Sequence, residues 1–195
     1  MDRFIRTARP LAMLSGPLVI ASEVFAIASG PSALALASTT GILAAVLALL
    51  AILTLLAGLI MQYAVQADRT RTLGVVGLLV AIVGAVMTAG SIWSAIFVVP
   101  GLAAAAPHVL ETGLSTVVVG SVASYGILGI GGLLTGISTL RAGVFPRGVA
   151  ITMIVGGVLC FAPVPARYAV LAIAVSILAA QTSPRRLAQA QPQVA

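Results

Sequence analysis

The chain has 195 residues, of which 61% are apolar and only 7% are charged, and its mean hydropathy is +1.20. This charge content is too low for a water-facing surface and excludes an ordinary soluble domain. The formal charge of +6 comes from arginines, since the chain has no lysine. Because these arginines lie in short segments next to the apolar stretches, we expect no nucleic-acid partner and predict contacts with anionic lipid headgroups instead.

Six apolar stretches predict an all-α, polytopic transmembrane helical bundle in a single membrane domain. A hydrocarbon core of about 30 Å requires roughly 20 helical residues per span. Arginines recur in alternate connections, and only Arg167 breaks the alternation. Positive charge is retained inside, so we predict a bacterial inner-membrane protein with both termini cytoplasmic. The predicted spans are residues 11–28, 41–64, 73–99, 113–140, 148–162 and 168–181, followed by a polar, disordered tail over 182–195.

The first two predicted spans differ in polar content. Arginines ahead of residues 11–28 give this segment the outline of a secretory signal, but Glu23 interrupts the apolar run. We therefore expect the first helix to be kept as an anchor. The second span, 41–64, is rich in leucine and nearly featureless, which predicts a helix that faces lipid.

Polar residues gather near the predicted outer end of the third span, 73–99, and in the outer connection that follows it. His108 and Glu111 are three positions apart in that connection, so they could share one helical face as part of a metal site. Two ligands are nevertheless too few to indicate such a site. We therefore predict no metal. The residues at this level are Ser91, Trp93 and Ser94 in the span and His108 and Glu111 in the connection.

The fourth span, 113–140, is dense in glycine and hydroxyl residues. Gly120 with Ser124, and Gly132 with Gly136, have the four-residue spacing that places small side chains on one helical face. Such a face lets another helix approach closely. The pattern predicts tight packing by this helix, and it is compatible with a homo-oligomer or with a membrane-protein partner.

Glu23 is the one acidic residue inside a predicted span, where an ionisable group costs about 2.5 to 3.5 kcal/mol unless it is paired or hydrated. Three interpretations remain open. Glu23 could pair with Arg167 and close the outer end of the bundle, or it could lie near enough to the interface to reach water. It could instead line an outward-opening pocket for a ligand or a proton. That hypothetical pocket comprises Glu23, Ser91, Trp93, Ser94, His108, Glu111, Tyr125 and Arg167.

Catalytic and cofactor signatures are absent from the sequence. A single histidine, a single cysteine and no lysine exclude bis-histidine haem, an iron–sulfur cluster and a retinal Schiff base. The sequence also lacks a phosphate-binding loop and a zinc-protease motif. We therefore predict no catalytic residues, no cofactor and no enzymatic activity. This favours an accessory or scaffold protein that packs through small-residue helix faces, with a small-solute carrier or a ligand or proton sensor using Glu23 as the alternative.

Two segments resemble small, uncharacterised polytopic membrane proteins of high-GC bacteria. They are WSAIFVVPGLAAAAP, residues 93–107, and LRAGVFPR, residues 140–147. The resemblance covers most of the chain from the second span onward and implies a membrane bundle. It carries no activity, so it assigns no functional residue.

Overall fold

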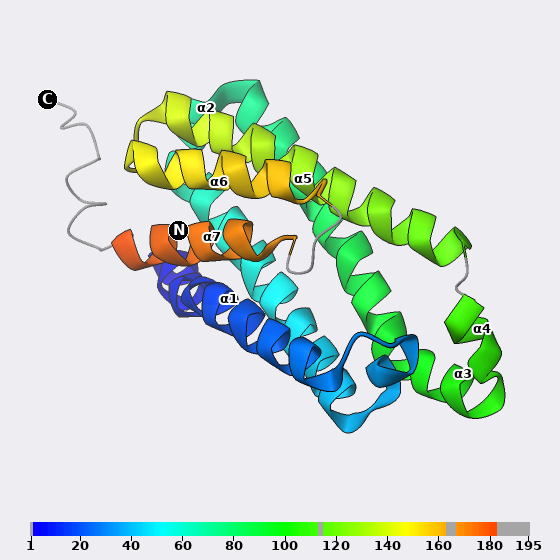
Figure 1. Ribbon diagram of the computed structural model, residues 1–195. Coiled ribbons are helices and arrows are strands. Elements are labelled where there is room, and N and C mark those ends of the chain that lie inside the picture. Colours follow the sequence, from blue (N-terminus) through cyan, green and yellow to red (C-terminus); the bar gives the residue numbers. More distant parts are fainter. Residues whose placement is uncertain (1, 113–114, 163–166, 183–195) are drawn as a thin grey trace, which may run out of the picture.

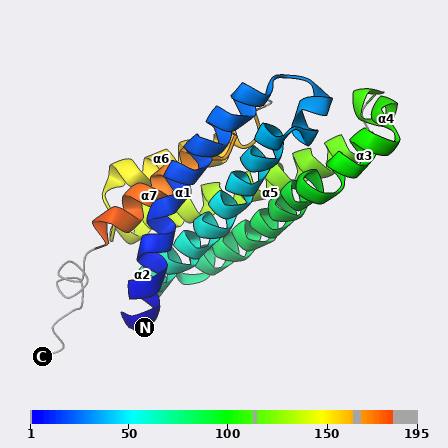
Figure 2. The same cartoon turned by 90° about the horizontal axis from the view of Figure 1, so that it is seen from below.

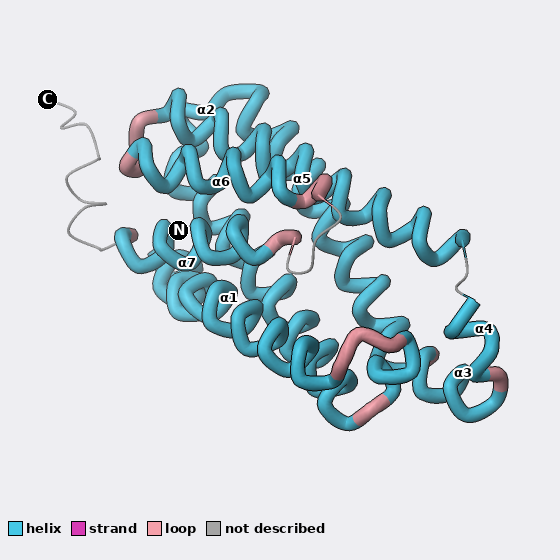
Figure 3. The backbone as a smooth tube through the Cα atoms, viewed as in Figure 1, coloured by secondary structure: helices cyan, strands magenta, loops and turns pink. Residues whose placement is uncertain are grey.

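The computed structural model describes residues 2–112, 115–162 and 167–182. Every regular element in these ranges is a helix, which confirms the predicted all-α class (Figure 3). The predicted polar tail from residue 183 onward lies outside the described residues. The elements are α1 (Asp2–Ser29), η1 (Ala33–Ala37), α2 (Thr39–Phe97), α3 (Val99–Ala105), α4 (Pro107–Thr112), α5 (Ser115–Ala142), α6 (Arg147–Leu159) and α7 (Ala169–Gln181).

Helix α2 is bent at Arg71, whose backbone leaves the helical conformation with φ 46° and ψ −150°. The chain reverses direction there, because α3, which follows α2, packs against η1, which precedes it (Figure 1). The second and third predicted spans therefore correspond to the first segment of α2, 39–70, and to its second segment, 72–97. The connection expected between these two spans, residues 65–72, is instead helical apart from Arg71.

Among the residues that the structure describes, three helical stretches are long and apolar enough to cross a membrane: Phe4–Ser29, Thr39–Ala105 and Thr116–Ala142. The second of them contains the bend at Arg71 and has the length of two crossings. Helices α6 and α7 have only 13 residues each. At 1.5 Å per residue each rises about 20 Å, less than the roughly 30 Å of a hydrocarbon core. The fifth and sixth predicted spans thus form helices where expected, but neither is long enough for an upright crossing.

The start of α7 is recessed from the end of the bundle. The Tyr168 hydroxyl, immediately before α7, donates a hydrogen bond to the Ala48 carbonyl oxygen at 3.4 Å. Ala48 lies about 14 Å along α2 from its first residue, Thr39. On α1, Ser22 donates to the Ala44 carbonyl at 2.9 Å, one turn nearer the start of α2. Tyr168 is therefore level with the interior of α2 rather than with its beginning.

The core lies between the first segment of α2 and helices α1 and α7. Ile52, Leu55 and Leu59 of α2 are fully buried, as are Leu171 and Leu178 of α7. The expectation that residues 41–64 face lipid therefore holds for only part of the helix surface, and the rest is buried. Both α1 and α7 pack against the segment, whereas Leu43, Leu50 and Leu53 on it remain exposed.

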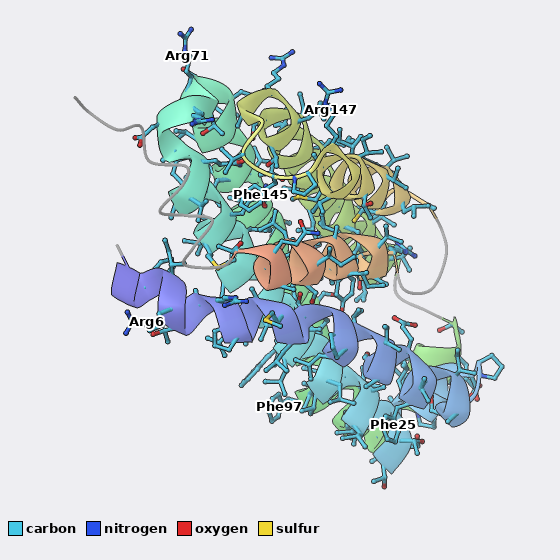
Figure 4. The ribbon with its side chains drawn as sticks, turned by 90° about the vertical axis from the view of Figure 1, so that its left-hand side faces the viewer. Arg6, Phe25, Arg71, Phe97, Phe145 and Arg147 are labelled. Carbon is cyan, nitrogen blue, oxygen red and sulfur yellow. The ribbon has the colours of Figure 1, made fainter. Side chains whose placement is uncertain are left out.

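The two ends of the bundle differ in charge. Arg6, Arg71 and Arg147 lie toward one side of the molecule, and Phe25 and Phe97 lie toward the other (Figure 4). The beginning of α1 and the end of α7 share one end of the bundle (Figure 2). This arrangement agrees with the arginine alternation that underlies the predicted topology.

Candidate functional site

Tyr125 and Arg167 form the centre of one polar group, where α5 meets the recessed start of α7. The Arg167 guanidinium carbon lies 5.0 Å from the centroid of the Tyr125 ring, in cation–π range. The Tyr125 and Tyr168 rings stack with centroids 6.2 Å apart. The charges of Glu23 and Arg167 both act on the Tyr125 hydroxyl, so Glu23 of α1 belongs to the same neighbourhood. The structure thus brings three of the predicted pocket residues together.

Three other predicted residues lie near the end of α2. The hydroxyl oxygens of Ser91 and Ser121 are 3.1 Å apart, which links the second segment of α2 to α5. The Ser94 hydroxyl donates to the Ser91 carbonyl at 2.7 Å, within its own helix. Trp93 is 56% exposed and its ring lies 4.3 Å from that of Phe97. These residues serve a helix contact and the apolar surface.

His108 and Glu111 lie in α4, so the connection predicted between the third and fourth spans is a pair of short helices rather than a loop. A proline near the start of each, Pro100 and Pro107, suits a first helical turn, which explains why these residues begin helices. Both side chains are exposed, and α4 packs on α3 and η1. Within the described ranges no group of three or more potential metal ligands occurs.

The predicted small-residue face of α5 divides into two parts. A Cβ on Gly132 would lie 3.3 Å from the Gly157 Cα, and one on Gly136 would lie 3.0 Å from the Ile154 nitrogen. Both glycines therefore admit α6 of the same chain. Ser124 is buried and donates to the Gly120 carbonyl at 2.7 Å. Gly120 itself is exposed, with no atom within 4 Å of a Cβ placed there.

Sequence reasoning missed a buried polar cluster between the first segment of α2 and α5. The side-chain amides of Gln62 and Gln66 both donate to the Thr139 hydroxyl oxygen, the latter at 2.9 Å. Thr139 in turn donates to the Thr135 carbonyl at 2.8 Å. All four residues are buried, with exposed fractions of 4% or less. The glutamines are four apart, so they share one face of α2, and that spacing was the available signal.

The cluster leaves acceptor capacity unused. The Oε1 atoms of Gln62 and Gln66 are buried and have no hydrogen-bond partner among the described residues. Buried polar atoms without a partner are uncommon and costly. These two oxygens would accept a hydrogen bond from a donor such as a water molecule, so the cluster can hold a small hydrogen-bonding guest.

Comparison of the chain with protein-family models, curated proteins and solved structures finds no match. The Tyr125 group joins α1, α5 and the α6–α7 connection, and the glutamine cluster joins α2 to α5. Both groups therefore lie where separate helices must be held together.

Proposed function

We propose that the chain is an integral protein of a bacterial inner membrane with both termini cytoplasmic. Its four long helical segments cross the bilayer, and α6 and α7 form a hairpin that enters from the cytoplasmic side and returns to it. The lengths of the helices and the grouping of arginines at one end support this topology. A full sixth crossing is unnecessary, because a hairpin returns the chain to the same side.

This topology accounts for the arginine that breaks the alternation. With six full crossings Arg167 would lie outside the cell, against the positive-inside rule. In a recessed hairpin it lies at the depth of Tyr125, whose ring faces its guanidinium. The charge of Glu23 acts in the same neighbourhood. Arginines inside membranes commonly have such partners, since an isolated charge there is costly.

The hairpin can be tested by thiol labelling in a Cys160→Ala background, which removes the single native cysteine. We expect Ala162→Cys, at the hairpin tip, to resist a membrane-impermeant maleimide added to intact cells. Leu36→Cys, on exposed η1 at the outer end, should react. Labelling after denaturation controls for thiol integrity. If Ala162→Cys reacts from outside as fast as Leu36→Cys, α6 crosses completely and the hairpin topology is wrong.

Within this topology we propose that the protein is a non-enzymatic accessory or scaffold subunit, which packs against another membrane-embedded helix through the outer half of α5. The observation that supports this is Gly120. It lies in a run from Thr116 to Gly120 that is exposed at every position. Each of the other glycines of α5 would have a neighbouring atom within 4 Å of an added Cβ.

The surface around Gly120 suits a helix–helix contact. Val117, Val118, Val119 and Val122 are all more than half exposed. Glycine lowers helix stability by about 1 kcal/mol relative to alanine, and in apolar helices it is used where a second backbone approaches. Such a combination of an open glycine and flanking valines favours a packing surface over one that meets lipid alone.

Photo-crosslinking in membranes of the native cell tests the packing surface. A photoreactive residue at Val119 should give a discrete protein adduct, either a dimer of this chain or a complex with one partner. Gly120→Leu should reduce its yield about tenfold or more, because the added side chain blocks close approach. The same probe at Val155, an exposed position on α6, serves as the control. Lipid adducts alone at both positions would contradict the proposal.

Gly148→Leu is the matched substitution for this experiment. Gly148 is also exposed, and a Cβ added there would likewise meet no atom within 4 Å, but it lies in the first turn of α6. We expect it to leave the Val119 adduct unchanged. An equal loss in Gly120→Leu and Gly148→Leu would indicate a general effect of added bulk and would count against the proposed surface.

A further inference from the structure

A pocket of about 420 Å³ lies at the arginine-bearing end, between the bend in α2 and the last turns of α5. Figure 4 shows Arg71 projecting from the bend in α2 at this end of the molecule. No carboxylate lines the pocket, and exposed Asp68 is next to it in sequence but outside its lining. Its charged and hydroxyl-bearing lining residues are Arg69, Thr70, Arg71, Thr72, Ser138 and Arg141.

The bend in α2 gathers positive charge at this pocket. Arg71 is the one non-glycine residue of the described ranges with a positive φ, a conformation that L side chains rarely adopt. Because the backbone turns there, Arg69 and Arg71 on either side of the bend line the same space as Arg141 of α5. Three arginines therefore line one pocket, and an anion in it would be attracted by all three charges.

The floor of the pocket is fixed by buried hydroxyl residues. Thr70 and Ser138 are 6% and 2% exposed. Ser138 donates to the Thr135 carbonyl at 2.9 Å, whereas the bond from Thr70 to the Ala67 carbonyl is long, at 3.5 Å. Ser138 adjoins Thr139 of the glutamine cluster, so this floor continues into the buried contact between α2 and α5. The pocket thus has a buried floor at Thr70 and Ser138 and an open side lined by exposed arginines.

We propose that this pocket binds a phosphate-bearing anion, with Arg69, Arg71 and Arg141 as its cationic ligands. The planar guanidinium fork matches the oxygen spacing of phosphate and can bind it in a bidentate manner. The Thr70 and Thr72 hydroxyls supply further donors. The cytoplasmic position of the pocket depends on the proposed topology, and the binding itself does not. Two sources share this chemistry: the headgroup of an anionic lipid in the inner leaflet and a soluble phosphate compound.

The soluble source is tested with the full chain in nanodiscs of phosphatidylcholine, titrated with inorganic pyrophosphate by calorimetry. Wild type should bind, and Arg141→Gln and Arg69→Gln should each weaken binding about tenfold or more. Arg147→Gln is the matched control, because Arg147 is exposed at the same end but does not line the pocket. It should change the affinity by no more than about twofold. Unchanged thermal unfolding midpoints would show that the variants remain folded.

The lipid source is tested in nanodiscs that contain a minority of phosphatidylglycerol, with retained lipid counted by native mass spectrometry. One phosphatidylglycerol retained by wild type and Arg147→Gln, and lost from Arg141→Gln, supports the pocket with a lipid headgroup as its ligand. Pyrophosphate binding with the same variant pattern supports it with a soluble ligand. Equal effects of Arg141→Gln and Arg147→Gln in both experiments would overturn the proposal, since the charges would then act only diffusely. Absence of binding in both experiments would also overturn it.

Discussion

Thr139→Val is expected to lower the free energy of unfolding by about 2 to 6 kcal/mol. The Thr139 hydroxyl is the common acceptor for the Gln62 and Gln66 amides. Valine preserves the shape of the side chain but leaves two buried amide groups without their acceptor, and each such group costs about 1 to 3 kcal/mol. Denaturant titration in mixed micelles, followed by the circular dichroism of the helices, measures the change.

Two variants determine whether the hydrogen bonds cause this loss. Thr139→Ser keeps the hydroxyl and should lose much less stability than Thr139→Val. Combining Thr139→Val with Gln62→Met and Gln66→Met should recover most of the loss, because replacing all the partners with apolar groups of similar size is nearly neutral. Equal losses for valine and serine at this position would show that the amides have other partners and that the cluster is not the reason.

Gly84→Ala is expected to destabilise the bundle by about 3 kcal/mol or more. A Cβ at Gly84 would overlap the backbone nitrogen and Cα of Leu128, and one at Gly131 would overlap the backbone of Ala81. The second segment of α2 and α5 therefore approach each other with glycine on both sides, and neither backbone can yield locally. Thermal unfolding in detergent should show a much lower midpoint for this single methyl group.

Gly90→Ala is the control within the same helix. Gly90 is exposed, and a Cβ added there would have no atom within 4 Å. Alanine there should raise stability by about 0.5 to 1 kcal/mol, since it favours the helix over the unfolded chain. If Gly84→Ala were as harmless as Gly90→Ala, the close contact between α2 and α5 would not exist in solution.

The positions of the helices could be predicted because each rests on a local signal. Apolar runs bounded by arginine or proline predicted helices close to the observed bounds of α5, α6 and α7. The helical character of 102–112 was missed, because an outer connection was expected to be irregular. How far α6 and α7 extend along the bundle depends on contacts with other helices. The contact between Tyr168 and Ala48 sets this depth, and no local sequence pattern predicts it.

The polar sites are harder to predict from the sequence, because only a rare residue such as a carboxylate stands out in an apolar span. Glu23 stood out as a lone carboxylate, and its placement with Tyr125 and Arg167 agrees with the expected neighbourhood. Its use as a ligand or proton pocket stays a prediction. Gln62 and Gln66 do not stand out in the sequence. Gln62 lies near the end of a leucine-rich predicted span, and Gln66 lies in the expected connection after it. Their shared acceptor, Thr139, is more than 70 residues away in the chain.

The shallow reach of α6 and α7 has a consequence for how the chain is assembled during synthesis. In the proposed topology no part of this hairpin is translocated across the bilayer. Arg167 therefore has to enter the hydrocarbon core only part of the way. Helix α7 packs against α1, α2 and α6, and these precede it in synthesis. We therefore expect the ribosome to release α7 after its binding groove has formed, so that the hairpin inserts last and closes a bundle already in place.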